Sequence, residues 1–247
     1  MKILACYSNK GGVGKTAAAV NLAYACAQSG NRTLLCDLDP QGASGFYFRI
    51  KPSRKLKEQA FFHDVDRFLG AIRGSDFENL DVVPANLTFR DFDIFLSRMK
   101  HSRSRLKKAL KIVNHEYDIV VLDCPPNISR LSENVFTLAD RIAVPVIPTT
   151  LSERTYTQLL AFFKEQRFER KKLLPFFSMI QRSKALHKET MKRMRKEHAR
   201  FLKTEIPFCT DVEKMGLHRT PVTVYAKRST AANAYLELWE ELHSRLH

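Results

Sequence analysis

The sequence predicts an α/β protein, a three-layer sandwich in which a mostly parallel central sheet carries helices on both faces. Two observations support this fold. Short apolar runs recur along the 247-residue chain, and buried parallel strands have this composition. Segments with helical spacing lie between the runs, and such alternation implies right-handed crossovers between parallel strands. The length suits one sizeable core, so we predict a single domain over residues 1–247.

The first apolar run, residues 3–7, leads into the sequence N-K-G-G-V-G-K-T at residues 9–16. The usual phosphate loop is spelled G-x-x-x-x-G-K-[ST], and here Asn9 replaces its first glycine. Small residues allow backbone N–H groups to close around phosphate oxygens, and a helix predicted at residues 15–29 directs its N-terminus at the same anion. A glycine-rich turn without ligand is the alternative. The residues expected to hold a nucleotide are Gly11, Gly12, Val13, Gly14, Lys15, Thr16 and Ala17.

Two residues of this loop carry the chemistry that a nucleotide needs. Lys15 is expected to neutralise the β- and γ-phosphates, and Thr16 is expected to hold Mg²⁺. ATP and Mg²⁺ are therefore the predicted cofactors.

Two further apolar runs end in acidic residues. Residues 32–36 precede Asp37 and Asp39, and residues 117–122 precede Asp123. Ligands of α/β sheets bind at the carboxyl ends of strands, so we expect these acids beside the phosphate loop; an ordinary capped turn after residue 36 is the alternative. An apolar strand ending in aspartate is the Walker B arrangement, in which Asp123 holds Mg²⁺ through water.

The remaining segments continue the alternation of strands and helices. Apolar runs predict further strands at residues 80–84, 141–147 and 173–180. Apolar residues at helical spacing predict helices at residues 61–72, 91–114, 184–203 and 231–246. The helix at 91–114 is expected to have one basic side.

The predicted helix at residues 184–203 separates apolar from basic residues. Leu186, Met194 and Leu202 lie on the side expected to face the core, whereas Lys188 lies about 200° from Leu186 around the helix. The net charge of +15 favours a polyanionic partner such as nucleic acid. Residues 164–203 hold fourteen Lys or Arg and four Glu. This excess favours a phosphate-contacting surface over the alternative, a merely solvated helix.

DNA binding is expected without base readout, because no helix-turn-helix or zinc-finger pattern is visible in the sequence. The candidate DNA-contacting residues are Lys184, Lys188, Lys192, Arg195, Lys196, Arg200, Lys214 and Arg219.

Cysteines and apolar segments indicate the compartment. Five scattered cysteines without a C-x-x-C pair are expected to be buried free thiols in a reducing cytoplasm. No apolar run reaches ~18 residues, so no membrane span is predicted, and a strand beginning beside Met1 leaves no room for a signal peptide. The helix at 231–246 has an apolar stripe with acidic flanks, so we expect it to dock on the protein body rather than on a membrane.

The sequence KGGVGKT at residues 10–16 resembles the deviant Walker A motif of the ParA/MinD family of P-loop ATPases. DLDPQG at residues 37–42 is similar to the family's switch segment, DCPP at residues 123–126 to its D-x-P-P, and Ile206-Pro207 to its I-P turn. The resemblance covers the whole chain and implies one ParA-like ATPase domain without an N-terminal DNA-binding extension.

The resemblance also implies roles for individual residues. Lys10 would act in trans, reaching across a dimer interface to the partner's nucleotide. Asp39 would orient the attacking water, and Pro207 would place its backbone beside the adenine. The implied catalytic residues are Lys10, Lys15 and Asp39, and the implied metal ligands are Thr16, Asp37 and Asp123.

By the same resemblance, ATP drives formation of a homodimer that binds double-stranded DNA nonspecifically, and a cargo-bound activator protein stimulates hydrolysis. The protein would be cytoplasmic, nucleoid-associated when ATP-bound, and without a membrane partner. Its cargo would be a plasmid, a chromosome or a protein organelle. Two segments depart from the family pattern: residues 148–152 lack its Q-x-E-like sequence, and residues 208–211 lack its arginines. These departures favour a protein cargo, as in the McdA-like carboxysome-positioning relatives.

Three alternatives share this fold. A MinD-like membrane-associated regulator is opposed by the acidic C-terminal helix, and a metal-cluster carrier is opposed by the lack of paired cysteines. A DNA-binding pseudo-enzyme is opposed by the intact Lys15, Thr16, Asp39 and Asp123.

Overall fold

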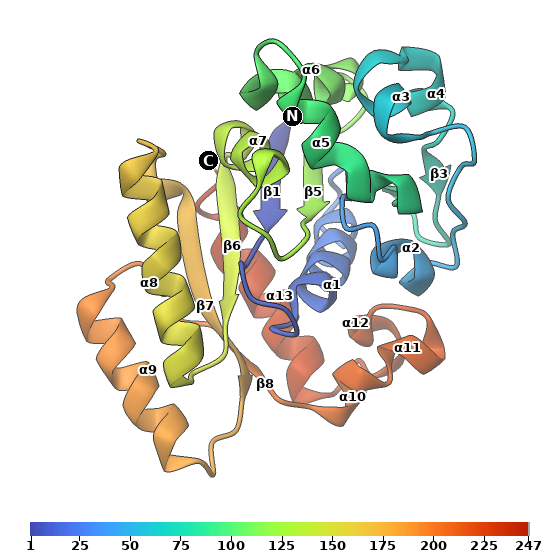
Figure 1. Cartoon of the computed structure of the whole chain (residues 1–247). Helices are drawn as coiled ribbons and strands as arrows, with labels where there is room; N and C mark the ends of the chain where they lie inside the picture. The colour runs from blue at the N-terminus through green and yellow to red at the C-terminus, as the bar shows by residue number, and fades with distance from the viewer. Residues whose placement is uncertain (247) are drawn as a thin grey trace.

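The strands form one eight-stranded sheet in the computed structural model, which describes residues 1–246 (Figure 1). The strand order is β3-β4-β2-β5-β1-β6-β7-β8, and neighbours pair in parallel except β3 with β4. This confirms the predicted mostly parallel sheet. The strands are β1 (Lys2–Cys6), β2 (Thr33–Asp37), β3 (Arg73–Gly74), β4 (Leu80–Val83), β5 (Ile119–Asp123), β6 (Arg141–Val146), β7 (Leu173–Ile180) and β8 (Glu205–Pro207).

Helices cover both faces of the sheet and give the predicted three layers. α1 and α13 pack on one face, and α7, α8 and α9 pack on the other (Figure 1). The helices are α1 (Lys15–Gln28), α2 (Ala43–Tyr47), α3 (Glu58–His63), α4 (Val65–Leu69), α5 (Phe92–Ser97), α6 (Arg105–Leu110), α7 (Arg130–Leu138), α8 (Thr150–Glu165), α9 (Ala185–Glu197), α10 (Thr210–Glu213), α11 (Met215–His218), α12 (Val222–Tyr225) and α13 (Thr230–His243). Short 3₁₀ turns occupy Leu87–Asp91, Ser102–Ser104, Lys111–Val113 and Arg170–Lys172.

Strand β1 shows why its sequence is almost wholly apolar. It lies between β5 and β6, so both of its edges are paired, and helices cover both of its faces. Leu4 and Cys6 join the core on the α1 and α13 side. Ile3, Ala5 and Tyr7 join the core on the opposite side. The phosphate loop therefore begins directly after a buried strand.

Two helices predicted from apolar spacing are interrupted. The single helix predicted at residues 61–72 is two helices, α3 and α4. The side chain of Asp64 caps the N-terminus of α4 and so separates it from α3. The prediction at residues 91–114 was also wrong. His101 has a φ of 54°, a left-handed conformation that ends a helix. The basic residues of that segment therefore lie on α6 and in the turns on either side of it, and none lies on α5.

The predicted helix at residues 184–203 ends at Glu197. Leu186, predicted to face the core, is 51% exposed, and Leu202 reaches the core from the segment after the helix. The physical reason is that residues four apart advance about 400°, so a stripe of every fourth residue drifts about 40° per step. The buried side of α9 consists instead of His187, Thr190, Met191 and Met194.

The C-terminal helix docks on the protein body, as predicted. Tyr235, Leu238 and Trp239 are buried in the core that α13 shares with α1. The indole N–H of Trp239 donates a hydrogen bond of 2.8 Å to the hydroxyl of Ser29. Within residues 1–246, no helix has both the length and the apolar character needed to span a bilayer.

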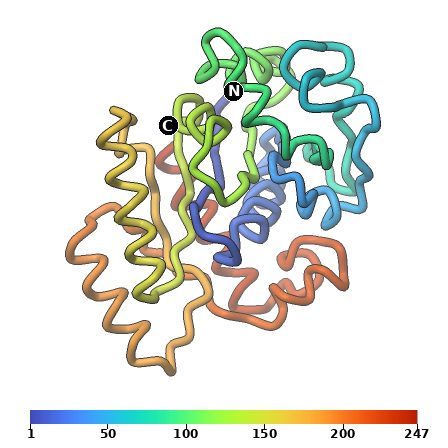
Figure 2. Tube along the Cα trace, viewed as in Figure 1, coloured from blue at the N-terminus to red at the C-terminus, as the bar shows by residue number. Residues whose placement is uncertain are grey.

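The outer layer at one side of the molecule is made by α8 and α9, which run side by side (Figure 2). Arg193 on α9 forms an ion pair of 2.6 Å with Glu153 on α8. Four of the five cysteines are buried as free thiols, and Cys209 is half-buried.

Candidate active site

The loop between β1 and α1 is shaped by two glycines with positive φ. Gly12 has a φ of 69° and Gly14 a φ of 91°, values that glycine adopts without the steric cost of a side chain. A Cβ on Gly14 would lie 3.1 Å from the Oγ atom of Ser178 on β7, whereas a Cβ on Gly11 or Gly12 would meet nothing within 4 Å. The loop is therefore close to β7 at Gly14 and open around Gly11 and Gly12.

Lys15 opens helix α1 and is 7% exposed. Its Nζ atom donates a hydrogen bond of 3.1 Å to the carbonyl of Lys10 in the same loop. Burial lowers the pKa of Lys15, while the charges of Asp123 and Asp39 oppose that change. The described residues give it no ion pair, so its charge is available to an anion at the N-terminus of α1.

Asp37 and Asp123 end the neighbouring strands β2 and β5 and lie opposite each other in register. Both are fully buried. Asp37 accepts 3.1 Å hydrogen bonds from the backbone N–H groups of Asp39 and Ser44, and Asp123 accepts one of 2.8 Å from the Ser44 hydroxyl. Burial, reinforced by the charge of Asp123, raises the pKa of Asp37. Burial also raises the pKa of Asp123 to about 6.

One oxygen of this acidic pair fits the role of a cation ligand. The Oδ1 atom of Asp123 is buried and has no hydrogen-bond partner among residues 1–246. A buried carboxylate oxygen without a partner is costly unless a cation or a proton neutralises it. Carboxylate and hydroxyl oxygens are the ligands that Mg²⁺ prefers. The donor set formed by Thr16, Asp37 and Asp123 therefore fits this ion.

The predicted metal and catalytic residues meet at one edge of the sheet. Thr16 on α1 and Ser44 on α2 both lie near Asp123 at the end of β5. Their hydroxyls lower the pKa of Asp123, against the larger effect of burial, which raises it. Asp39 follows β2, half-buried, and its Oδ1 atom accepts a 3.0 Å hydrogen bond from the backbone N–H of Gln41. The charge of Asp39 acts on both Lys15 and Asp123.

Lys10, half-buried in the phosphate loop, contacts helix α8. Its Nζ atom donates a 2.9 Å hydrogen bond to the Oγ atom of Ser152 in the first turn of α8, and the Thr149 hydroxyl donates to the same Oγ at 3.1 Å. Lys10 is thus tied to its own chain, through the segment in which the sequence departs from the family pattern.

Pro207 ends β8 and pairs in register with Ile180, the last residue of β7. It lines a hollow of about 620 Å³ together with Phe208 and residues of α13. Strand β7, which pairs with β8, also approaches the phosphate loop at Ser178. Pro207 therefore lies one strand away from the strand that approaches this loop.

The structure divides the candidate DNA-contacting residues into two groups. Three arginines contact their own chain: Arg195 pairs with Glu205 at 2.9 Å, Arg200 donates to a backbone carbonyl at 3.2 Å, and Arg219 lies over the Phe46 ring at 4.6 Å. The others are exposed and have no ion pair among the described residues: Lys184, Lys188, Lys192, Lys196 and Lys214.

Two serines at the site escaped prediction. Ser44 bonds to both buried acids, and Ser152 receives Lys10. The only signal for Ser44 is its place five residues after Asp39, and Ser152 is the last residue of the departure at residues 148–152. The contact made by a short polar side chain outside a motif cannot be predicted from the local sequence.

A glycine loop joining a buried strand to a helix, facing two acids at the ends of adjacent strands, defines a P-loop nucleotide hydrolase. A family model described as an AAA domain matches residues 1–175. The sporulation initiation inhibitor protein Soj of Bacillus subtilis is 31% identical over 98% of both chains. The chromosome partitioning protein ParA of Caulobacter vibrioides is 29% identical over 99% of this chain and 95% of its own. The chain belongs to this family and is a ParA/Soj-like P-loop ATPase.

A solved structure agrees with this assignment. Cobyrinic acid a,c-diamide synthase from Mycobacterium smegmatis, with bound ADP and magnesium, superposes with a TM-score of 0.80 at 25% identity. The match covers 98% of this chain and 94% of that protein. The P-loop NTPase fold predicted from the sequence is confirmed.

Proposed function

We propose that this ATPase dimerises when it binds ATP, binds duplex DNA nonspecifically in that state, and leaves DNA when a cargo-bound activator stimulates hydrolysis. The observation that carries the proposal is Lys10, a second lysine beside a complete phosphate and metal site. ATP and Mg²⁺ are its cofactors, and its relatives include partitioning proteins. We further propose that the ATP-bound protein resides on the nucleoid.

Each residue of the proposed site has one task. Lys15 and the N–H groups of the loop bind the phosphates, because their charge and dipoles point at one position. Thr16, Asp37 and Asp123 hold Mg²⁺, which when bound offsets phosphate charge. Asp39, half-buried at the mouth of the site, orients the attacking water. Loss of the γ-phosphate then relaxes the segments that contact it.

Substitution of Lys10 tests the proposed dimerisation. In the proposed dimer Lys10 contacts the partner's nucleotide, so its bond to Ser152 must open. Lys10→Ala should still bind ATP in one subunit but remain monomeric in light scattering with ATP and Mg²⁺. Lys51→Ala, an exposed lysine outside the site, is the matched control. A Lys10→Ala dimer as stable as the wild type would exclude the role in trans.

The DNA surface is proposed on α9. Lys188, Lys192 and Lys196 are exposed on this helix. Replacing all three with Glu should weaken binding to unrelated duplexes and lower the slope of log K against log salt by up to roughly 0.9 per lost phosphate contact. ATP hydrolysis without DNA should not change. An unaltered slope would make α9 a solvated face only.

A further inference from the structure

A second basic surface lies at the edge of the sheet where the strands begin, opposite the phosphate loop (Figure 1). From Ile94 to His115 the chain contains seven Lys or Arg and no Asp or Glu. The segment forms α5, α6 and the turns between them. Lys107, Lys108 and Lys111 are exposed and have no ion pair among residues 1–246. Solubility alone would be served by charges of both signs.

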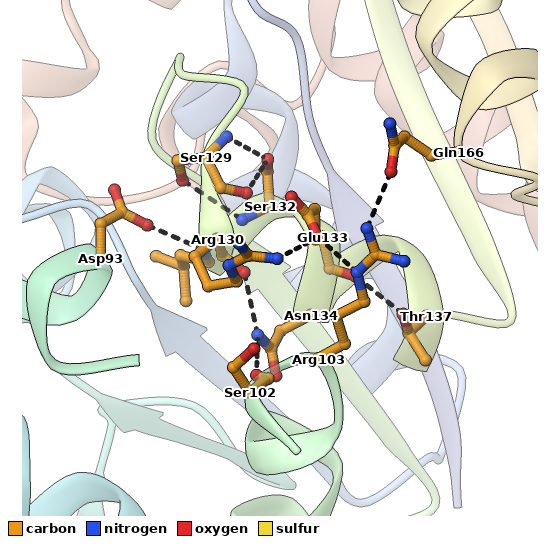
Figure 3. A network of polar contacts seen from close by, with 11 residues as sticks. Asp93, Ser102, Arg103, Ser129, Arg130, Ser132, Glu133, Asn134, Thr137 and Gln166 are labelled. Atoms are coloured by element: carbon orange, nitrogen blue, oxygen red, sulfur yellow. Dashed lines mark hydrogen bonds and ion pairs between the residues drawn. The ribbon is translucent and has the colours of Figure 1, made fainter. Parts of the chain in front are cut away.

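Helix α7 fixes the shape of this surface (Figure 3). Asn134, 1% exposed, donates to the carbonyl of Ser102 at 2.7 Å and accepts from the N–H of Leu106 at 3.2 Å. Arg103 and Arg130 share one carboxylate oxygen of Glu133, at 2.6 and 2.9 Å. Two guanidinium groups on one carboxylate leave a net positive charge in a fixed position.

The two arginines border a shallow hollow of about 350 Å³. His101, two serines and Thr137 complete its lining. Arg103 also donates to Gln166 at the end of α8 at 2.8 Å. Guanidinium groups held in this way present unused N–H donors, the geometry that suits phosphate oxygens.

This surface continues toward α9. On the turn at Arg170–Lys172, the Nζ atom of Lys172 donates to the carbonyls of Phe136 and Thr137 on α7, at 3.3 and 3.1 Å. Thr137 also lines the hollow, so this turn lies beside it. On its other side, Arg200 beyond α9 donates to the carbonyl of Lys171 at 3.2 Å. A basic tract therefore runs from the segment after α9 through residues 170–172 to the hollow bordered by Arg103 and Arg130.

We propose that the α6 surface, defined as Lys107, Lys108 and Lys111 with the hollow bordered by Arg103 and Arg130, binds the phosphate backbone of duplex DNA and extends the α9 surface. The proposal rests on the proposed DNA binding. A duplex is the ligand that the tract favours, because it offers one phosphate charge per ~1.7 Å of its axis and so matches an extended row of cations.

The test compares three charge-reversed proteins, each altered at three exposed basic residues. The first carries Lys107→Glu, Lys108→Glu and Lys111→Glu, and the second carries the α9 triple replacement. The control carries Lys51→Glu, Arg54→Glu and Lys55→Glu on an exposed loop. Anisotropy of a labelled 40-base-pair duplex is measured with ATP and Mg²⁺ over a range of salt, and DNA-free ATP hydrolysis reports an intact fold.

We expect the α6 variant to bind at least tenfold more weakly, with a salt slope lower by up to about 2.7 and normal DNA-free hydrolysis. A slope equal to that of the wild type would overturn the proposal. An equal loss in the control would also overturn it, because net charge would then be the cause. Inorganic phosphate should displace the duplex no better than chloride at equal ionic strength; selective displacement would assign the hollow to free phosphate instead.

The outcome also separates this inference from the proposed function. If wild-type protein with ATP binds no duplex, both fail. If it binds and only the α9 variant is weakened, the α6 surface alone is refuted. If only the α6 variant is weakened, the α9 assignment is refuted and the α6 surface stands.

Discussion

Replacement of Gly14 by alanine should disturb the phosphate loop for two separable reasons. The positive φ costs an L residue about 1–2 kcal/mol. A Cβ would also lie 3.1 Å from the Oγ atom of Ser178, and crowding of a packed site costs about 1–3 kcal/mol. Alanine also reduces the conformational entropy of the unfolded chain, which stabilises the folded protein by about 0.4–1 kcal/mol. We therefore expect Gly14→Ala to lose about 2–4 kcal/mol of unfolding free energy.

Two neighbouring glycines are internal controls for this prediction. Gly12→Ala has the positive φ but open space, so it should lose only about 1 kcal/mol. Gly11→Ala has neither penalty and should be neutral or slightly stabilised. Ser178→Ala in the Gly14→Ala background should restore most of the difference between the two positive-φ variants. Urea unfolding of nucleotide-free protein measures all four, and equal losses for Gly12→Ala and Gly14→Ala would refute the contact with β7.

Three further predictions concern charge at the site. Lys15→Ala should abolish ATP binding in calorimetry, because the phosphates lose their buried cation; unchanged affinity would remove Lys15 from the site. Asp39→Ala should bind ATP normally but release phosphate at least tenfold more slowly, and wild-type turnover would exclude its role in orienting water. Asp123→Asn should stabilise Mg²⁺-free protein at pH 7 yet abolish Mg²⁺-dependent turnover. A folded-state pKa raised to about 6 means that stability falls as pH rises through roughly 4–6, by up to about 1.4 kcal/mol per unit. The advantage of Asn in urea unfolding should therefore be much smaller at pH 5 than at pH 7, and an equal advantage at both would contradict the shift.

The sequence identified six of the eight strands formed by residues 1–246, because each of the six is a run of mostly buried apolar residues. It did not identify the exposed two-residue β3 or the three-residue β8, which lie at the two edges of the sheet. Residues 3–7 and residues 119–122 have no polar interruption, and a short run of this kind between turn residues is typical of a strand covered on both sides. The phosphate loop was equally recognisable, because glycine, lysine and threonine occur at fixed spacing. These local signals were enough to place Lys15, Asp37 and Asp123 at one edge.

The features that the sequence analysis missed depend on contacts between residues far apart in the chain. Apolar spacing at residues 91–114 predicted one helix, but the chain is left-handed at His101, and Asn134 on α7 donates a hydrogen bond to the carbonyl of the next residue, Ser102. Stepping by four assigned Leu186 to the core, although α9 turns that residue outward. The bond between Lys10 and Ser152 joins positions 142 residues apart, and no local pattern encodes it.

In the proposed function, ATP controls DNA binding by this ATPase. The most direct measurement is the anisotropy of two labelled duplexes of unrelated sequence, titrated with wild-type protein in ATP and Mg²⁺ and again in ADP and Mg²⁺. Because phosphates supply the affinity and a dimer doubles the basic surface, the two duplexes should bind about equally and at least tenfold more tightly in ATP. The same affinity in both nucleotides, or binding of only one sequence, would contradict the claim.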